Sequence, residues 1–543
     1  MLLGWAIVLV LAIELLVGGL CLYYLAHNSD AVATPAASLR ALRQTQRSTQ
    51  YFSVEGISSQ QEVQQTSKNN KTVSPTRNVE PSLNIKRRTA VIDAFQHSWI
   101  GYRKFAWGRD EVTPLKGGYN DAWGGFAVTM IDALDTAMMM GLHAETEEAI
   151  AWLASNLHFD KNHDVSVFEM TIRVLGGLIS AHDLSGGDAR LLKLARHVGD
   201  QLLPGVSPAP SAVLNIRSGR IRRGPGNIAE QGTLQLEYAR LSAVAPDEHK
   251  YWTATGTFAK LLYGGGSQSD LALRPPSLNG GYDSFYEYIL KLFLIGNKTD
   301  VALRQSYTNM ARSVRTDLVK TCEDGSSWIG QRRHGEGGAW MEHLACFAPG
   351  MLALGVLSGA SDAAAADTRA AIATAESCYS LYSSSPTGLA PDSVSFDGRP
   401  RSQRGKSHPG ICSGKVHITG EKYSLRPETI ESLFYLWRLT RNETYREWGW
   451  HIFQSLNAHC RTPVGYAGLL DVQRSSSRED SEPSFFMAEV LKYLFLLFSD
   501  DDVLPLDEWV LNTEAHPLRV KHRPTTRLVD DRVVVDALLD RMH

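Results

Sequence analysis

Apolar residues recur at helical spacing through most of the chain. The segment at 88–107, RTAVIDAFQHSWIGYRKFAW, places them three and four positions apart, which is the period of an amphipathic helix. Turns rich in Gly, Pro and Ser separate the segments of this kind. The pattern predicts an all-α domain over residues 86–517, in which repeated helix pairs form a toroid. Further predicted helices lie at 127–142, 167–184, 229–244, 283–296, 349–359, 427–440 and 483–498.

Two other regions precede this domain. Residues 5–25 are apolar except for Glu14 and are about long enough to span a membrane as a helix. No Lys or Arg comes before them, which favours a transmembrane signal-anchor over residues 1–27. The alternative is secretion after signal cleavage, since the AVA sequence at 31–33 offers a cleavage site. Residues 28–85 are rich in Ser, Thr, Gln and Asn and predict a disordered stem. Residues 518–543 form a C-terminal tail.

Composition narrows the class of partner. The 55 Lys and Arg residues nearly balance the 58 Asp and Glu residues. The chain therefore has no overall field that would hold nucleic acid. Either interpretation of the first segment directs the chain to the secretory pathway, and the sequons at Asn70, Asn297 and Asn442 fit that destination.

Cysteine usage leaves the pairing open. Cys21 lies in the apolar segment, and five of the six cysteines fall in the predicted domain. Because five is odd, at least one stays unpaired in an oxidising compartment, and no CxxC spacing indicates a zinc site.

Carboxylates occur in several of the most apolar helical segments. Glu169 and Arg173 are four residues apart on one helix face, and Asp283 lies in the aromatic-rich stretch at 282–287. Glu428 and Glu431 are three residues apart in another segment. Each pair alone is most simply a local salt bridge or a charge at a helix end. Their co-occurrence predicts that these faces meet at one polar cavity.

Longer motifs follow one another along residues 88–517. They are FEMTIRVLGGLISA, GTLQLEYARLS, YDSFYEYILK, MEHLACFAPG, YSLRPETIESLFYLWRLT, SFFMAEVLKYLFLLFSDD and LNTEAHP. In sequence and in order, these motifs resemble glycoside hydrolase family 47, the class I α-mannosidases.

The resemblance implies an (α/α)7 barrel whose mouth is plugged by a β-hairpin, with Thr513 binding Ca²⁺ through its backbone and hydroxyl oxygens. It also implies hydrolysis of terminal α-1,2-linked mannose from Man9-type N-linked oligosaccharides of glycoproteins. We accordingly expect a monomeric, single-pass type II protein of the Golgi or endoplasmic reticulum membrane, with the catalytic domain in the lumen.

The implied reaction inverts the anomeric centre, which needs one carboxyl group as acid and another as base. By similarity, Glu169 is the acid. Glu428 ranks first as the base because Pro427 can begin a helix, whose dipole favours an ionised carboxylate in the first turn. Asp283 is the competing base candidate.

Other residues match family positions around the sugar. The resemblance implies a disulfide between Cys346 and Cys378. The implied substrate-binding residues are Arg173, His343, Arg426, Glu431, Phe485, Glu489 and Glu514.

Two positions depart from the family. The motif at 388–392 ends in Asp392 where the family usually has Glu. The carboxyl group that the resemblance implies to be catalytic is thus kept, but on a shorter side chain. Gly281 replaces the Arg of endoplasmic-reticulum-type members, so we expect broader, Golgi-type trimming. The alternative function is a mannosidase-like lectin in glycoprotein quality control. The presence of Glu169, Asp283, Glu428 and Thr513 together favours the enzyme.

Overall fold

The computed structural model describes residues 81–207, 210–245, 249–251, 262, 270, 273–333, 336–397 and 412–520. The chain divides into two units, Met1–Pro75 and Thr76–His543, and the described residues all belong to the second. The predicted signal-anchor, the stem up to residue 80 and the tail from residue 521 lie outside them. Among the described residues, no helix combines the length and the apolarity needed to cross a membrane.

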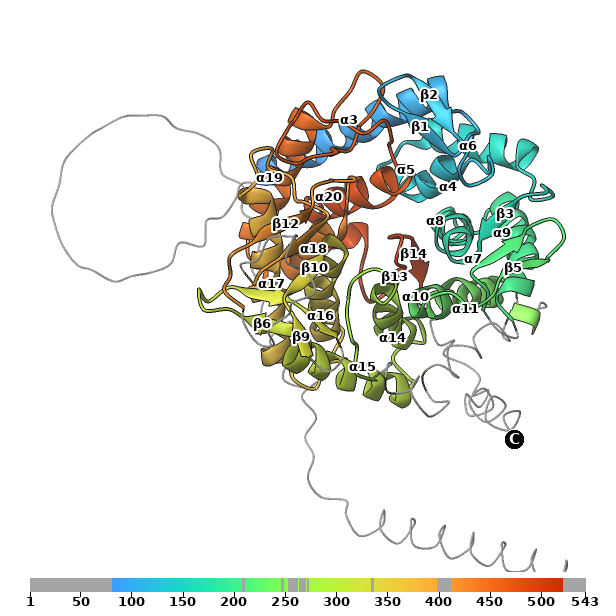
Figure 1. Cartoon of the computed structure of the whole chain (residues 1–543). Coiled ribbons are helices and arrows are strands. Elements are labelled where there is room, and N and C mark those ends of the chain that lie inside the picture. Colours follow the sequence, from blue (N-terminus) through green and yellow to red (C-terminus); the bar gives the residue numbers. More distant parts are fainter. Residues whose placement is uncertain are drawn as a thin grey trace, which may run out of the picture. The chain divides into compact units, whose positions relative to one another are not determined.

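The predicted helical segments form a ring of neighbouring inner helices, and the prediction of a helical domain is confirmed. Each inner helix contacts the next one along the chain. The π-helical segment that directly precedes the last inner helix contacts the first inner helix, which closes the ring. Figure 1 looks along the axis of this ring. The inner helices are α5 (Leu134–Met139), α8 (Gly176–Leu184), α11 (Gln235–Val244), α14 (Asp283–Ile295), α16 (Ala348–Leu357), α18 (Glu428–Thr440) and α20 (Leu491–Leu497), the last preceded by η7 (Phe486–Val490).

Outer helices pack against the inner ones as partners in pairs. They are amphipathic: in α9 the buried positions Leu191, Leu194, Ala195, Val198 and Leu202 follow the helical period. Inner helices are more deeply buried because both of their faces are covered; every residue of α18 from 428 to 438 is buried. The outer helices are α3 (Pro81–Phe105), α6 (His143–Asn156), α9 (Ala189–Leu202), α15 (Val301–Ser313), α17 (Ala364–Ser383) and α19 (Thr444–His459).

Short segments complete the helical layer. Helix α3 begins inside the predicted stem, five residues before the expected boundary at residue 86. The short segments are α4 (Val128–Asp132), α7 (Val167–Glu169), η1 (Met170–Leu175), η2 (Leu203–Gly205), α10 (Ile228–Gly232), η3 (His249–Tyr251), η4 (Val314–Leu318), η5 (His343–Phe347) and η8 (Asp501–Val503).

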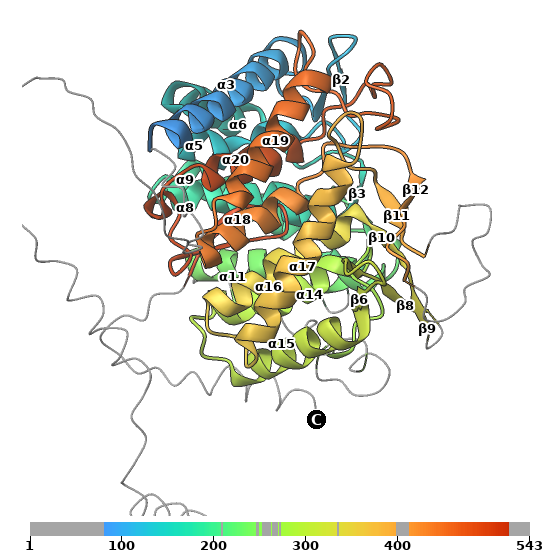
Figure 2. The same cartoon turned by 90° about the vertical axis from the view of Figure 1, so that its left-hand side faces the viewer.

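The strands are short and pair antiparallel. Figure 2 shows β2, β3 and β8–β12 gathered at one side of the helices. Apart from the hairpin described next, the strands are β1 (Glu111–Thr113), β2 (Gly118–Asn120), β3 (Asp164–Ser166), β4 (Val213–Asn215), β5 (Ile221–Arg223), β6 (Val319–Thr321), β7 (Ser327–Ile329), β8 (Gln331–Arg333), β9 (Glu336–Gly338), β10 (Trp340–Glu342), β11 (Ser393–Ser395) and β12 (His417–Gly420).

A hairpin of β13 (Trp509–Leu511) and β14 (Pro517–Arg519) lies inside the ring (Figure 1). Its turn is fixed by buried polar contacts. Asn512 Oδ1 accepts from the backbone N–H groups of Glu514 and His516, at 2.9 and 2.8 Å. The His516 ring lies between Asp132 and Asp135, at 3.0 and 2.7 Å, and Lys492 Nζ donates to Asp135 at 2.8 Å. Thr513, at the tip of the turn, is thereby held at the ring's centre.

Two disulfides are present among the described residues. Cys346 pairs with Cys378, as the resemblance implied. Cys322 pairs with Cys412, which the sequence left unassigned, and Cys460 is a buried free thiol.

Candidate active site

A cavity of about 320 Å³ opens at the centre of the ring, beside the β13–β14 turn. Its wall combines carboxylates, two arginines and apolar side chains from seven different parts of the chain. This arrangement agrees with the predicted meeting of charged helix faces. The predicted site residues that line it are Glu169, Arg173, Asp283, Arg426, Glu428, Glu431, Phe485, Glu489, Thr513 and Glu514.

Glu169 is held by Arg173. Ser166 caps helix α7 by accepting from the Glu169 backbone N–H, and Glu169 is the last residue of that helix. Arg173 Nε donates to Glu169 Oε2 at 2.8 Å, while its Nη1 contacts Glu514 and lies 3.5 Å from Asp132 Oδ2. Burial disfavours the guanidinium charge, but these carboxylates raise the pKa of Arg173 well above its ordinary value. Arg173 is thus a permanent cation that orients Glu169.

Arg173 and Glu489 both lie in π-helical segments, η1 and η7. A π turn shifts the side chains that follow by a fraction of a turn, and such insertions are frequent at functional sites. Periodicity analysis cannot find them because it assumes an unbroken helical repeat.

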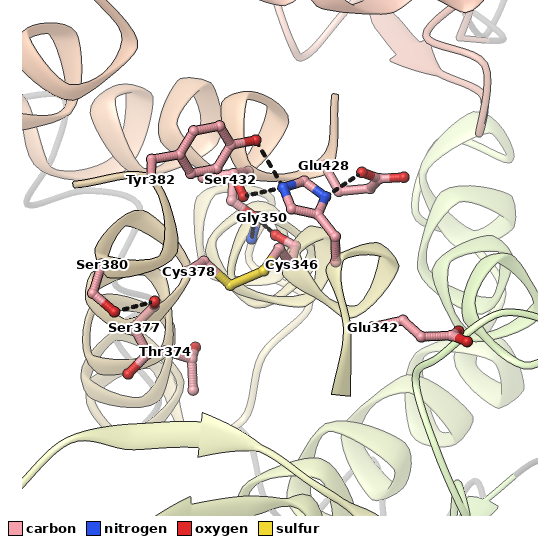
Figure 3. The surroundings of a disulfide bond; sticks show 12 residues. Glu342, Cys346, Gly350, Thr374, Ser377, Cys378, Ser380, Tyr382, Glu428 and Ser432 are labelled. Atoms are coloured by element: carbon pink, nitrogen blue, oxygen red, sulfur yellow. Dashed lines mark hydrogen bonds and ion pairs between the residues drawn. A yellow bond between two sulfur atoms is a disulfide. The ribbon is translucent and has the colours of Figure 1, made fainter. Parts of the chain in front are cut away.

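Glu428 is the first residue of α18, after the N-cap Pro427. His343 Nδ1 lies 2.7 Å from the Glu428 Oε2 (Figure 3). Arg426 Nη1 lies 3.8 Å from the Glu428 Oε1. Burial by itself would favour the neutral acid, yet the His343 hydrogen bond and the nearby Arg426 guanidinium hold the pKa of Glu428 below its usual value. Glu428 is therefore ionised near neutral pH.

His343 and Asp392 do not line the cavity. His343 is buried behind Glu428, with Nε2 2.7 Å from the Tyr382 hydroxyl and 3.1 Å from Thr429 Oγ1. Its contact with Glu428 places it beside that carboxylate rather than on the cavity surface. Asp392 Oδ1 lies 3.5 Å from Arg426 Nε and so reaches the cavity through that arginine.

The Cys346–Cys378 disulfide joins the two elements that hold this imidazole. Cys346 belongs to η5, which begins at His343, and Cys378 belongs to α17, which carries Tyr382 (Figure 3). The Cys346 carbonyl also accepts from Ser432 Oγ, one turn after Glu428, at 2.5 Å. The disulfide thus ties η5 to α17 directly behind the site.

Asp283, the other base candidate, behaves differently. It is the first residue of α14, and its Oδ1 accepts from the Ser284 N–H at 2.9 Å. Burial, together with the nearby charges of Glu287, Glu428 and Glu342, raises the pKa of Asp283 to about 7. At neutral pH Asp283 is about half protonated.

Further acids lie around Thr513. Burial and mutual repulsion raise the pKa of Glu431 to about 8 and the pKa values of Glu489 and Glu514 well above their usual range. Lys291, which contacts Glu287 and donates to the Asn512 carbonyl at 3.1 Å, supplies positive charge here. Carboxyl groups crowded in this way would ionise together more readily beside an additional cation.

Sequence reasoning missed part of the wall. Asn227, Glu230 and Phe347 also line the cavity. Asn227 and Glu230 form a reciprocal capping box, whose Asn-x-x-Glu spacing is visible in the sequence and signals a helix start, though not a cavity. Gly281, with φ of 85°, lines the cavity, and a Cβ there would lie 3.3 Å from Asn227. Any side chain at position 281 would narrow the cavity.

An ionised carboxylate and protonatable carboxyl groups around one polar cavity are suited to acid–base cleavage of a glycosidic bond. Comparisons with known proteins agree. The model of glycosyl hydrolase family 47 matches residues 94–520. A mannosyl-oligosaccharide 1,2-alpha-mannosidase of Arabidopsis thaliana is 38% identical over 82% of this chain and 81% of its own.

An endoplasmic reticulum mannosyl-oligosaccharide 1,2-alpha-mannosidase of Homo sapiens is 40% identical, over 80% of this chain and 64% of its own length. The structure of an alpha-1,2-mannosidase from Trichoderma reesei is similar with a TM-score of 0.73 and 27% identity, covering 81% of this chain and 99% of that one. The fold and site are those of a glycosidase. The chain belongs to glycosyl hydrolase family 47.

Proposed function

We propose that this chain removes terminal α-1,2-linked mannose from Man9-type N-linked oligosaccharides of glycoproteins. Family membership and the names of the relatives support this substrate. The observation that carries the proposal is the pairing of His343 with Glu428, because it keeps one carboxylate of the central cavity ionised.

In the proposed inverting reaction, Glu169 gives a proton to the leaving glycosidic oxygen and Glu428 takes a proton from the attacking water. Glu428 is preferred to Asp283 because its pKa is lowered, whereas the pKa of Asp283 is raised to about 7. Arg173 orients the Glu169 carboxylate, with which it shares a 2.8 Å hydrogen bond. Attack on the face opposite the leaving oxygen inverts the anomeric carbon.

We assign Ca²⁺ to Thr513. Among the described residues, no group of three or more His, Cys, Asp or Glu is placed to hold a metal ion. A hard cation here would therefore take oxygen ligands from Thr513, water and sugar hydroxyls, which suits Ca²⁺. The surrounding carboxylates, with their raised pKa values, fit a divalent charge. When bound, the ion would orient the sugar.

The remaining assignments follow from the same family. We propose that Arg426, Phe485, Glu431 and Glu489 bind the sugar, and that Gly281 leaves room for several branches. The ring is proposed to be an (α/α)7 barrel plugged by the β13–β14 hairpin. We retain the proposal of a monomeric protein anchored in the endoplasmic reticulum or Golgi membrane, with residues 1–27 as anchor and 28–85 as stem.

The decisive experiment is time-resolved mass analysis of a Man9 N-glycan incubated with the purified protein, with Ca²⁺ or with a chelator. We expect stepwise loss of hexoses with Ca²⁺ and none from Glu428→Gln. If the wild-type protein binds the glycan but leaves it intact, the proposal of hydrolysis is wrong and the chain is a lectin.

A further inference from the structure

A second, smaller hollow adjoins the catalytic cavity. Its volume is about 170 Å³, and it shares Arg426 and Phe485 with the larger cavity. The rest of it is lined by Ser424, Gly468, Glu479, Ser481 and Pro483, and none of these five lines the larger cavity. The two hollows are therefore adjacent, and one guanidinium group and one aromatic ring border both of them.

We propose that this smaller hollow is a distal sugar subsite, which receives a hexose of the same oligosaccharide, away from the mannose being removed. The subsite would determine which branch of the glycan enters the catalytic cavity. This inference rests on the proposed function, and the experiment below separates the two.

The lining has the chemistry that a sugar needs. Hydroxyl groups of a hexose both donate and accept hydrogen bonds, and two serine hydroxyls and a carboxylate provide both kinds of partner. Lys422 Nζ donates to Glu479 Oε1 at 2.7 Å, whereas Oε2 points toward Gly468, 3.7 Å from where a Cβ there would lie. The partly exposed ring of Phe485 supplies an apolar face on which a sugar ring can pack.

The hollow is preformed rather than a gap between loose loops. The Glu479 N–H donates to the Gly468 carbonyl at 2.8 Å, so the two walls are tied together. Tyr423 and Leu469 exchange backbone hydrogen bonds of 2.8 and 2.9 Å below the floor. A Cβ on Gly468 would lie 2.8 Å from the Tyr423 carbonyl, so the close approach of these backbones requires glycine.

Arg426 connects the smaller hollow with the carboxylates of Glu428 and Asp392. Its Nη1 lies 3.8 Å from Glu428 Oε1, and its Nε lies 3.5 Å from Asp392 Oδ1. A glycan extending from the catalytic cavity into the hollow would pass over this guanidinium. A short substrate would end before reaching it.

The test compares a Man9 N-glycan with the disaccharide α-1,2-mannobiose, which supplies only the sugar removed and the leaving sugar. Glu479→Gln removes a charged acceptor, and Ser481→Phe fills the hollow. Glu421→Gln is the matched control, because Glu421 is exposed close by and does not line the hollow. All variants are made in the full chain.

We expect kcat/KM for Man9 to fall about tenfold in Glu479→Gln, as for one lost hydrogen bond to a charged group, with an altered order of mannose loss. Cleavage of mannobiose should stay at the wild-type rate in both variants, and Glu421→Gln should match wild type throughout. Equal losses on both substrates, or none on either, would overturn the subsite.

Binding separates this inference from the proposed function. If the wild-type protein cleaves neither substrate, hydrolysis is rejected, and calorimetry of Man9 binding then decides the subsite. Weaker binding in Glu479→Gln than in Glu421→Gln would support it, and equal binding would refute it.

Discussion

Nδ1 of His343 lies 2.7 Å from Oε2 of Glu428, although the two residues are 85 positions apart in the chain. The imidazole is buried, and its other nitrogen is held by the Tyr382 hydroxyl. Glu428, the proposed base, is therefore kept ionised in part by a residue that does not line the cavity.

Replacing this imidazole should move the pH profile. In His343→Phe, Glu428 loses its hydrogen-bond donor, so its pKa should rise toward the value that burial alone dictates. Because the base must be ionised, the acidic limb of kcat/KM should shift to higher pH. Tyr382→Phe, which retains the bond to Glu428, should shift it less. An unchanged acidic limb would show that His343 does not tune Glu428.

Asp283→Asn should stabilise the protein at alkaline pH. The folded-state pKa of about 7 lies above the ordinary value of 3.8, so folding takes up a proton between these values and stability falls as pH rises through them. The amide mimics the protonated acid. The gain at pH 8 should be about 2 kcal/mol, less than the full shift implies because Asp283 is partly exposed.

Thermal unfolding at pH 4 and pH 8 tests this expectation, with Glu323→Gln, an exposed site, as control. A gain of the same size at both pH values would contradict the linkage to Asp283.

Calcium should raise the melting temperature through Thr513. An ion that binds the folded state alone stabilises it by mass action, so Tm should climb with Ca²⁺ concentration and drop on chelation. Thr513→Val removes the hydroxyl ligand and should weaken this dependence, while Thr316→Val, at an exposed position, should not. Differential scanning fluorimetry over a Ca²⁺ series provides the measurement. Identical curves for the wild type, Thr513→Val and Thr316→Val would show that the Thr513 hydroxyl does not bind Ca²⁺.

Lys492→Met should lower the free energy of unfolding, because it removes a buried contact that holds the β13–β14 hairpin in place. Lys492 Nζ is buried against Asp135 Oδ1 at 2.8 Å and the Ala515 carbonyl at 2.6 Å. Burial alone would raise the pKa of Asp135, but Lys492 and His516 lower it to about 2. Losing one partner of a buried pair leaves an uncompensated charge, which costs about 3 kcal/mol.

Denaturant unfolding measures this loss of stability. It is done near neutral pH, which lies above the pKa of Asp135 in both the folded and the unfolded state. Lys116→Met is the control, because Lys116 is exposed and lies 3.5 Å from Asp480. Equal stability of the two variants would mean that the buried pair does not anchor the hairpin.

The sequence by itself determined the helical domain and most members of the site. Apolar periodicity is a local property, so segments such as 283–296 and 427–440 predicted α14 and α18 closely. Carboxylates in these apolar segments indicated a shared cavity, and Glu428 was placed in a first helical turn because Pro427 precedes it.

Tertiary structure alone decided how those residues work. The pKa values of Glu428 and Asp283 diverge because different neighbours, distant in sequence, surround each carboxylate. Sequence reasoning placed His343 on the sugar-binding surface, whereas the fold buries it behind Glu428. The Cys322–Cys412 pairing and the hollow beside Glu479 likewise exist only once remote segments meet. Charge state and cavity shape depend on such contacts, which no local pattern encodes.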